Sequence, residues 1–403
     1  MNATHRYVPR NYRWFNKLLK WTLGAWLRRA YRVESRGGEF LKALKPPFIV
    51  VANHVTTRDP FILGPLIRQP VYWVTGDGAM RTPLLGKILR FVGSIPKTKA
   101  IPDMQTINWI VEVTRKRKGV VGVFPEGQAT WDGRSLPVLP ATAKLLKLLK
   151  IPVVAARISG GYSSLPRWTW KRRPGRFVVD WKLALEPAEL KALTAEEIVA
   201  RLESAIGHDE CAYLEAEPQE FESRRMAEHL ELSLFMCPAC GSIGKLKSFR
   251  SRFNCLACGE ALALDGRYRF RRLGGGEPAF TTIRDWDAWQ EKTFAAAAAR
   301  AAAERPEAPF LSDPGALLLR GRKTRPLRRV RAGTLLLYRD RLELATHFGS
   351  RLSFPLAEIE GANVYKRNLL EFYVGRTLFQ ARFPLRATSA RKWCMGIEAL
   401  KVP

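Results

Sequence analysis

Two short apolar runs in this chain each end in a turn that carries ionisable side chains. Residues 48–52 (Phe-Ile-Val-Val-Ala) lead into Asn53 and His54, and residues 120–124 (Val-Val-Gly-Val-Phe) lead into the turn Pro125-Glu126-Gly127. Apolar, β-branched runs of this length predict buried strands. His54 and Glu126 are therefore expected at strand ends, which is where open α/β sheets bind ligands.

Asp59 lies five residues after His54 and is followed by Pro60. Aspartate can cap a helix and proline suits its first turn, so a helix is predicted to begin here. Residues five apart on a helix diverge by roughly 140°, but a strand-to-helix turn can fold the carboxylate back onto the imidazole. A carboxylate bonded to one ring nitrogen fixes the tautomer and leaves the other nitrogen free to remove a proton. The spacing thus predicts a general base with its orienting partner.

Each fragment also has a purely structural interpretation. Asp59 alone could be a helix cap, His54 a polar loop residue, and Pro-Glu-Gly only a turn. The two fragments occur together, in order and both at predicted strand ends. This combination favours a catalytic site.

Four blocks between roughly residues 35 and 215 resemble the glycerolipid acyltransferases of the 1-acylglycerol-3-phosphate acyltransferase type. They are Asn53-His54 with Asp59, residues 93–99 (Gly-Ser-Ile-Pro-Lys-Thr-Lys), Phe124-Pro125-Glu126-Gly127, and residues 151–154 (Ile-Pro-Val-Val). The first and third blocks are the specific ones. The resemblance implies an α/β domain in which helices flank a mixed sheet.

The same resemblance implies a reaction and a set of roles. In this family a histidine activates a hydroxyl of a lysolipid, which attacks the thioester of acyl-CoA or acyl-carrier protein without an acyl-enzyme. His54 would be the base and Asp59 its orienting carboxylate, while Asn53, Glu126 and Gly127 would belong to the acceptor site. The default acceptor is 1-acylglycerol-3-phosphate, which implies a part in phospholipid biosynthesis.

Two of the blocks depart from the family pattern. Members commonly continue the third block as Glu-Gly-Thr-Arg, whereas Gln128 and Ala129 follow here, and Lys99 stands where the second block usually ends in arginine. A missing arginine removes a fork-shaped phosphate ligand, because lysine offers only a point charge. The candidate phosphate ligands are Lys97, Lys99 and Arg134.

The charge balance points to a polyanionic partner. The 403 residues include 67 lysines and arginines against 37 aspartates and glutamates, a net charge of +30, and 46% are hydrophobic. Nucleic acid and an anionic membrane surface both suit such a charge. No stretch approaches the ~20 apolar residues of a membrane-spanning helix, and no secretory signal pattern is present. We expect a peripheral protein on the cytoplasmic face of the cell membrane.

The N-terminal segment favours the membrane. Helical spacing from Tyr12 to Arg32 puts basic residues on one side and aromatic residues on another. Tryptophan beside a basic face is typical of a helix lying in the lipid headgroup layer. The alternative is a surface helix that packs its aromatic stripe on the catalytic domain. The basic set is Arg13, Lys17 and Lys20, and the apolar set is Trp14, Phe15, Leu18, Trp21, Ala25 and Trp26.

Four cysteines define a second module. Cys237 and Cys240 form one C-x2-C knuckle, Cys255 and Cys258 form another, and fourteen residues separate them. This spacing predicts a zinc ribbon with a closed, structural tetrahedral Zn²⁺ site. Redox or disulfide use of the same thiols is the alternative. Cys211 and Cys394 stand alone and are expected to be ordinary thiols.

The chain beyond the ribbon is predicted to end in a β-rich domain. We expect a membrane-surface helix over residues 1–34, an acyltransferase domain over 35–225, a zinc ribbon over 230–265, a linker over 266–328 with a helix from Arg284 to Glu304, and a β-rich domain over 329–403 closed by a helix at 389–400. This last order of elements is similar in architecture to pleckstrin-homology-type domains. The basic tract 320–331 suits a solvated loop or an anionic-lipid contact equally.

Three classes of function follow. The leading one is an active acyltransferase at a membrane surface that uses a lysolipid and acyl-CoA or acyl-carrier protein. The second is a catalytically altered lipid-binding scaffold. The third, a zinc-ribbon protein that binds nucleic acid, rests only on the charge and the cysteines.

Overall fold

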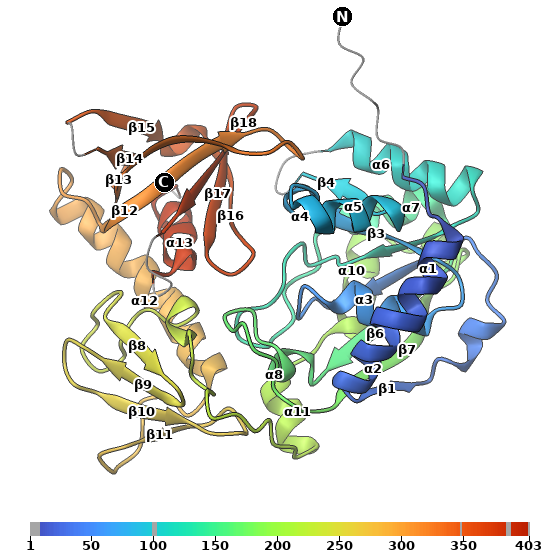
Figure 1. Cartoon of the computed structure of the whole chain (residues 1–403), viewed down its shortest axis with the longest axis horizontal. Coiled ribbons are helices and arrows are strands. Elements are labelled where there is room, and N and C mark those ends of the chain that lie inside the picture. Colours follow the sequence, from blue (N-terminus) through green and yellow to red (C-terminus); the bar gives the residue numbers. More distant parts are fainter. Residues whose placement is uncertain (1–8, 99–102, 347–348, 384–387, 402–403) are drawn as a thin grey trace, which may run out of the picture. The chain divides into compact units, whose positions relative to one another are not determined.

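The structure is a computed structural model that describes residues 9–98, 103–346, 349–383 and 388–401. The chain divides into two compact units (Figure 1). Unit 1 comprises residues 1–167 and 172–221, and unit 2 comprises residues 168–171 and 222–403.

Unit 1 is built on a seven-stranded mixed sheet with the order β1-β7-β6-β2-β5-β3-β4. Neighbouring strands are parallel except for the antiparallel pair β6 and β7. This confirms the expected α/β core. The strands are β1 (Val33–Arg36), β2 (Phe48–Ala52), β3 (Val71–Gly76), β4 (Ile95–Lys97), β5 (Val120–Val123), β6 (Val153–Ser159) and β7 (Phe177–Leu185).

Helices cover the sheet, and Figure 1 shows α7 and α10 beside it. All five residues of β2 are buried, as the apolar run predicted. Ile49 of β2 and Val121 of β5 share a core with Leu146 of α7 and Leu202 of α10. The helices of unit 1 beyond residue 58 are α3 (Asp59–Leu63), α4 (Asp77–Met80), α5 (Pro83–Phe91), α6 (Met104–Val111), α7 (Pro140–Leu149), α8 (Gly161–Ser164), α9 (Glu189–Ala192), α10 (Ala195–Ile206) and α11 (Glu210–Ala216).

The adjacency of β2 and β5 positions the two sequence motifs. These strands are parallel neighbours, with Val51 opposite Val123. Parallel strands end at the same edge of a sheet, so the turns after β2 and β5 lie side by side. The first and third blocks therefore meet although they are far apart in the sequence.

A continuous helical segment precedes the sheet. It consists of α1 (Arg13–Leu19), a π-helical turn (Lys20–Gly24) and α2 (Ala25–Ala30). Gly24 approaches Pro65 so closely that an added Cβ would lie 2.6 Å from the proline ring. One face of this helical segment thus packs on the rest of unit 1.

The opposite face leaves its aromatic side chains in solvent. Trp14, Trp21 and Trp26 are 62%, 82% and 58% exposed. Phe15 instead packs on Phe91 of α5, with ring centroids 5.3 Å apart. The alternative of a stripe packed on the catalytic domain therefore holds for Phe15, and contact of the exposed tryptophans with lipid stays a prediction. Among the residues that the structure describes, no helix is long and apolar enough to cross a membrane.

Lys20 does not belong to the solvent-facing basic set in which the sequence placed it. Its ammonium group donates to the carbonyl oxygens of Ile67 and Arg68, the latter at 3.2 Å. Burial lowers the pKa of Lys20 below its usual value. The two acceptors lie 47 and 48 positions away in the sequence, so helical spacing alone could not take them into account.

The described part of unit 2 contains two sheets and two α-helices. The first sheet carries the cysteines and has four strands in the order β11-β10-β9-β8. The second sheet is antiparallel and has seven strands in the order β15-β14-β13-β12-β18-β17-β16. This seven-stranded sheet packs on the terminal helix α13. The elements are β8 (Leu246–Phe249), β9 (Arg252–Cys255), β10 (Ala261–Leu264), β11 (Phe270–Arg272), α12 (Ile283–Glu304), β12 (Leu311–Gly321), β13 (Arg328–Leu337), β14 (Arg341–Ala345), β15 (Arg351–Pro355), β16 (Ile359–Tyr365), β17 (Leu369–Val374), β18 (Thr377–Arg382) and α13 (Ala390–Lys401).

The seven-stranded sheet of unit 2 begins earlier in the chain than the sequence indicated. Strand β12 lies in the range assigned to a linker, yet it is a central strand that pairs with both β13 and β18. Pro314 and Gly315 interrupt its apolar pattern, and the strand accommodates them in a register shift between Asp313 and Ala316. The basic tract 320–331 consequently comprises the end of β12, the start of β13 and the loop 322–327 that joins them.

Candidate active site

The turn between β2 and α3 brings His54 and Asp59 together. Oδ2 of Asp59 lies 2.8 Å from Nδ1 of His54 and also accepts from the backbone N–H groups of Val55 and Thr56, both at 2.9 Å. The Thr56 hydroxyl donates to Oδ1 at 2.8 Å. The Asp59 side chain is completely buried, whereas that of His54 is 20% exposed. The carboxylate is therefore fixed and the imidazole remains accessible.

Asp59 does not act as the helix cap that the sequence predicted. Helix α3 does begin at Asp59 with Pro60 in its first turn, but its N-cap residue is Arg58, which makes no side-chain cap. The carboxylate folds back instead onto the buried N–H groups of the preceding turn. Buried N–H groups need acceptors, and this turn has no strand partner to supply them.

The geometry at Nδ1 sets the chemistry of His54. A ring nitrogen that faces a carboxylate carries the proton and donates it to that carboxylate. The other nitrogen, Nε2, then holds a lone pair and can accept a proton from a hydroxyl group. The arrangement can thus perform general-base catalysis.

Aromatic rings stack on the imidazole. The ring of Phe124 lies 4.3 Å from that of His54 with an interplanar angle of 24°, and Trp73 stacks on the far side of Phe124 at 5.2 Å. Gly122 makes room for this stack, because an added Cβ would lie 2.3 Å from Trp73. The sequence analysis did not predict the stack, and the glycine inside an otherwise apolar strand was its only signal.

Glu126 holds the backbone of His54. Its Oε1 accepts from the His54 N–H at 3.1 Å, and its Oε2 accepts from the Leu136 N–H at 3.0 Å. Burial raises the pKa of the Glu126 carboxyl to about 8. The His54 carbonyl in turn accepts from the N–H of Thr130 at 3.0 Å. The side chain predicted as part of an acceptor site therefore faces the protein backbone.

Asn53 also turns inward. Its side-chain amide donates to the Ile158 carbonyl at 2.9 Å and accepts from the Ile158 N–H at 2.7 Å. The side chain is 1% exposed. This pair of bonds fastens the end of β2 to β6, so Asn53 positions His54 from the side opposite to Glu126.

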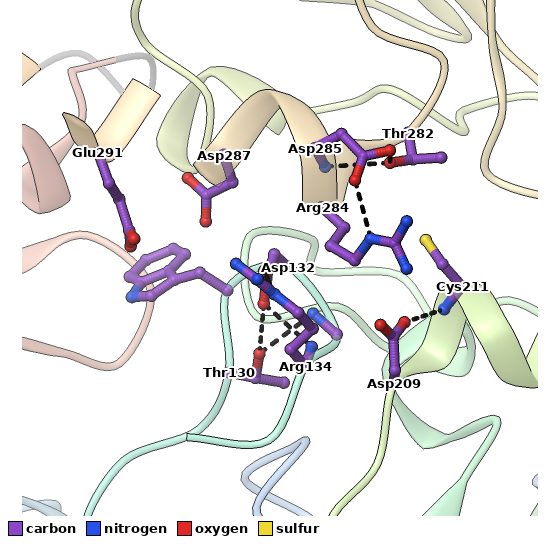
Figure 2. Close-up of polar contacts among 12 residues, drawn as sticks. Thr130, Asp132, Arg134, Asp209, Cys211, Thr282, Arg284, Asp285, Asp287 and Glu291 are labelled. Carbon is purple, nitrogen blue, oxygen red and sulfur yellow. Dashed lines mark hydrogen bonds and ion pairs between the residues drawn. The ribbon is translucent and has the colours of Figure 1, made fainter. Parts of the chain in front are cut away.

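Two of the predicted phosphate ligands, Lys97 and Arg134, lie on different segments of unit 1. Lys97 is half-buried at the end of β4, and Lys99 lies outside the described residues. Arg134 donates from Nε to Asp132 at 2.7 Å, and Thr130 donates to the same carboxylate at 3.0 Å (Figure 2). Gly127 is exposed at the tip of its turn with a φ of 75°.

A further cation contacts the third block. Arg167 lies over the ring of Trp131 at 4.2 Å and donates to the Ala129 carbonyl at 2.8 Å. The two residues are 38 positions apart, and no local pattern connects them. This guanidinium adjoins the segment in which Ala129 stands where the family commonly has arginine.

The four predicted metal ligands come together in unit 2. The sulfur atoms of Cys237, Cys240, Cys255 and Cys258 all lie within 4.8 Å of one another. Cys394 is buried and Cys211 is half-buried, and neither belongs to this cluster.

Comparisons with known proteins agree with this geometry. The family described as Acyltransferase matches residues 32–159, a range that includes His54, Asp59 and Glu126. The 1-acyl-sn-glycerol-3-phosphate acyltransferase of Saccharomyces cerevisiae is 31% identical over 120 residues, which are 28% of this chain and 39% of the yeast protein. This chain thus spans well under half the length of that relative.

A solved structure is also similar. The 1-acyl-sn-glycerophosphate acyltransferase PlsC of Thermotoga maritima is 19% identical, with a TM-score of 0.42, and the match covers 51% of this chain and 82% of that one. The family match over residues 32–159 and the yeast relative support the acyltransferase-family domain that the sequence blocks indicated.

Proposed function

We propose that the protein transfers a fatty acyl group from a thioester, acyl-CoA or acyl-carrier protein, to a free hydroxyl of a lysophospholipid. The observation that carries this proposal is the contact between His54 Nδ1 and Asp59 at 2.8 Å, next to an accessible imidazole edge at the end of a buried strand. The default acceptor is 1-acylglycerol-3-phosphate, in keeping with the name of the yeast relative.

His54 and Asp59 perform the proton transfers of this reaction. Nε2 of His54 removes the proton of the acceptor hydroxyl while the hydroxyl oxygen attacks the thioester carbonyl. Collapse of the tetrahedral intermediate forms the ester and breaks the carbon–sulfur bond. The imidazolium returns its proton to the departing thiolate, and Asp59 stabilises the imidazolium in between. The products are a diacyl lipid and a free thiol, with no net proton change.

Two residues would position the base and do not touch the substrate. Glu126 and Asn53 fix the backbone on both sides of His54 through buried hydrogen bonds. A base held in this way needs little reorganisation when the acceptor arrives. Arg167, Arg134 and Lys97 supply the cations that would meet the phosphate of the acceptor.

Attachment to an anionic membrane is part of the proposal. Trp14 of α1 and Trp21 of the π-helical turn that follows are exposed, and the chain carries a net charge of +30. Tryptophan suits the headgroup layer, and basic residues near an anionic surface add about 1 kcal/mol each. The acceptor lipid would then reach the site from the surface to which the enzyme is bound, on the cytoplasmic side.

A substrate panel tests the proposal. The full chain is incubated with anionic vesicles that contain 1-acylglycerol-3-phosphate or other lysophospholipids, together with acyl-CoA or acyl-carrier protein. Mass spectrometry is expected to detect a diacyl product for at least one pair, with release of one thiol per ester. If no combination yields product while the vesicles bind the protein, it is a lipid-binding scaffold. If the protein prefers nucleic acid to vesicles across a salt series, the membrane assignment fails.

A further inference from the structure

The four clustered sulfur atoms have the separations of a tetrahedral metal site. Cys237 and Cys258 have their sulfur atoms 3.8 Å apart, as do Cys240 and Cys255. A Zn–S bond is about 2.3 Å long, so the edge of the tetrahedron formed by four sulfur ligands is about 3.8 Å. A disulfide would require a much shorter separation of about 2.05 Å. The cluster therefore fits a metal and not a pair of disulfides.

The backbone supports the sulfur atoms in the same way in both knuckles. The N–H of Gly241 donates to the Cys237 carbonyl at 2.9 Å, and the N–H of Gly259 donates to the Cys255 carbonyl at 3.0 Å. Both glycines have positive φ, 71° and 78°, and a Cβ at either would meet nothing within 4 Å. Each glycine is needed for its backbone conformation and not for space. Two equivalent turns thus present two sulfur atoms each.

A hydroxyl group adjoins the sulfur atoms. The Ser242 Oγ lies 3.1 Å from the Cys240 sulfur and 3.3 Å from the Cys255 sulfur. Hydrogen bonds to ligating thiolates orient them and moderate their charge. Four thiolates complete a tetrahedron and leave no open position, so a metal here would be structural.

The segment just before the first knuckle is tied to α12 by buried hydrogen bonds. Gln290 Oε1 accepts from the N–H groups of Phe235 and Met236, at 2.7 and 3.0 Å. The indole N–H of Trp286 donates to the Met236 carbonyl at 3.0 Å. Gln290 and Trp286 are 0% and 1% exposed, so no water can replace these bonds. The position of α12 therefore depends on the chain that leads into Cys237.

The same network continues to the terminal helix α13. Gln290 donates to Asp287 at 3.1 Å, and Asp287 also accepts from the guanidinium of Arg391 at 2.6 Å. Arg391, on α13, also donates to Glu291 at 3.0 Å and is 6% exposed. Figure 2 shows Asp287 and Glu291 projecting from α12. A buried arginine that loses its carboxylate is strongly destabilising, so α13 requires Asp287 in place.

We propose that Cys237, Cys240, Cys255 and Cys258 bind one Zn²⁺ ion, and that this ion stabilises all of unit 2 and not only the four-stranded sheet. Metal binding fixes the position of the chain at Met236. Gln290 bonds both to that segment and to Asp287. Asp287 in turn holds Arg391 of α13, the helix that packs on the seven-stranded sheet. Because a metal site of this kind forms only in the folded chain, its binding free energy becomes folding free energy. The inference is independent of the acyl-transfer chemistry.

Metal content tests the first half of the inference. The full chain, purified without chelators, is expected to contain one zinc per molecule by mass spectrometry. Cys258→Ser, which replaces an exposed ligand, should lower the content at least about tenfold, and the control Cys211→Ser should retain one zinc. Iron in place of zinc, or no bound metal with four freely reactive thiols, would overturn the assignment.

Hydrogen exchange of the full chain tests the second half. Removal of zinc with a chelator is expected to raise exchange about tenfold or more in β8, β9, the first half of α12 and α13, while β2 and β5 keep their protection. An increase confined to residues 237–258 would overturn the proposed coupling.

Two variants of α12 test whether Gln290 connects the metal site to α13. Gln290→Ala should retain one zinc, while α13 exchanges faster even with the metal bound. The control Lys292→Ala, an exposed residue of the same helix, should behave as wild type. If α13 is equally protected in Gln290→Ala and in wild type, Gln290 does not connect the metal site to α13 and the inference fails.

Discussion

The backbone N–H of His54 donates to Oε1 of Glu126 at 3.1 Å across a sequence separation of 72 residues. This bond joins the two motifs that define the site, because β2 and β5 are parallel neighbours and end together. The second carboxylate oxygen of Glu126, Oε2, accepts from the N–H of Leu136, and the residue is 5% exposed. Its geometry is that of a positioning residue, one that acts on the reaction through His54.

The role of Glu126 can be tested by separating kcat from KM. Glu126→Ala removes both backbone acceptors, and a displaced base should lower kcat by a factor on the order of 10² while the KM for the lysolipid changes little. Glu126→Gln keeps one acceptor oxygen and should lose less. Steady-state kinetics on vesicles would show the difference. A large rise in KM with kcat unchanged would mean instead that Glu126 binds the acceptor.

Glu126 also predicts a pH dependence of stability. Burial raises the pKa of this carboxyl to about 8 in the folded protein, whereas an unfolded glutamate titrates near about 4.3. Between these values the folded state binds more protons, so the free energy of unfolding falls as the pH rises through this window. Glu126→Gln cannot ionise and should show a smaller decline.

Denaturant unfolding of unit 1, followed at pH 6 and at pH 8.5 for both proteins, measures this decline. The variant is expected to be less stable than wild type at pH 6, by about 1 kcal/mol, because its NH₂ group cannot accept from Leu136. An equal decline in the two proteins would contradict the account.

The stack beside the imidazole depends on Gly122. A Cβ at this position would lie 2.3 Å from Trp73, so Gly122→Ala should destabilise unit 1 by about 1–3 kcal/mol and shift the ring of Phe124. The matched control is Gly64→Ala, where an added Cβ would lie 3.6 Å from Nε1 of the same tryptophan. Thermal unfolding compares the two. Similar losses in both variants would show that contact with Trp73 is not the cause.

The N-terminal helix offers a paired test of membrane attachment. Trp14 and Trp21 are exposed, and replacing either by serine should weaken binding to anionic vesicles by about tenfold. Lys17→Ala should weaken binding modestly and in a salt-dependent way. Lys20→Ala should mainly lower thermal stability, because its ammonium group bonds to backbone carbonyls of unit 1. Vesicle sedimentation across a salt series separates these effects, and unchanged binding in both tryptophan variants would refute the attachment.

Local patterns were sufficient to predict strands β2 and β5, the turn that joins His54 to Asp59, and the gathering of the four cysteines. These features depend on neighbours in the sequence, since an apolar run forms a buried strand and two C-x2-C knuckles at this spacing favour one site. Helix α12 (Ile283–Glu304) was likewise predicted from its local sequence, over residues 284–304.

Contacts between distant segments could not be predicted in this way. Glu126 was expected to face the acceptor because it follows a strand, yet its carboxyl is used by backbone donors of two other segments. Arg167 reaches Ala129 from 38 positions away. Strand β12 was assigned to a linker because Pro314 and Gly315 at its register shift hide the alternation of apolar residues.

The central claim is that His54, oriented by Asp59, is the base for acyl transfer. The most direct measurement is the single-turnover rate of ester formation by wild type, His54→Gln and Asp59→Asn, with the donor and acceptor pair that the substrate panel identifies. Wild type should form the diacyl product, and each variant should be at least about 100-fold slower while binding vesicles normally. Ester formation by His54→Gln at the wild-type rate would contradict the account.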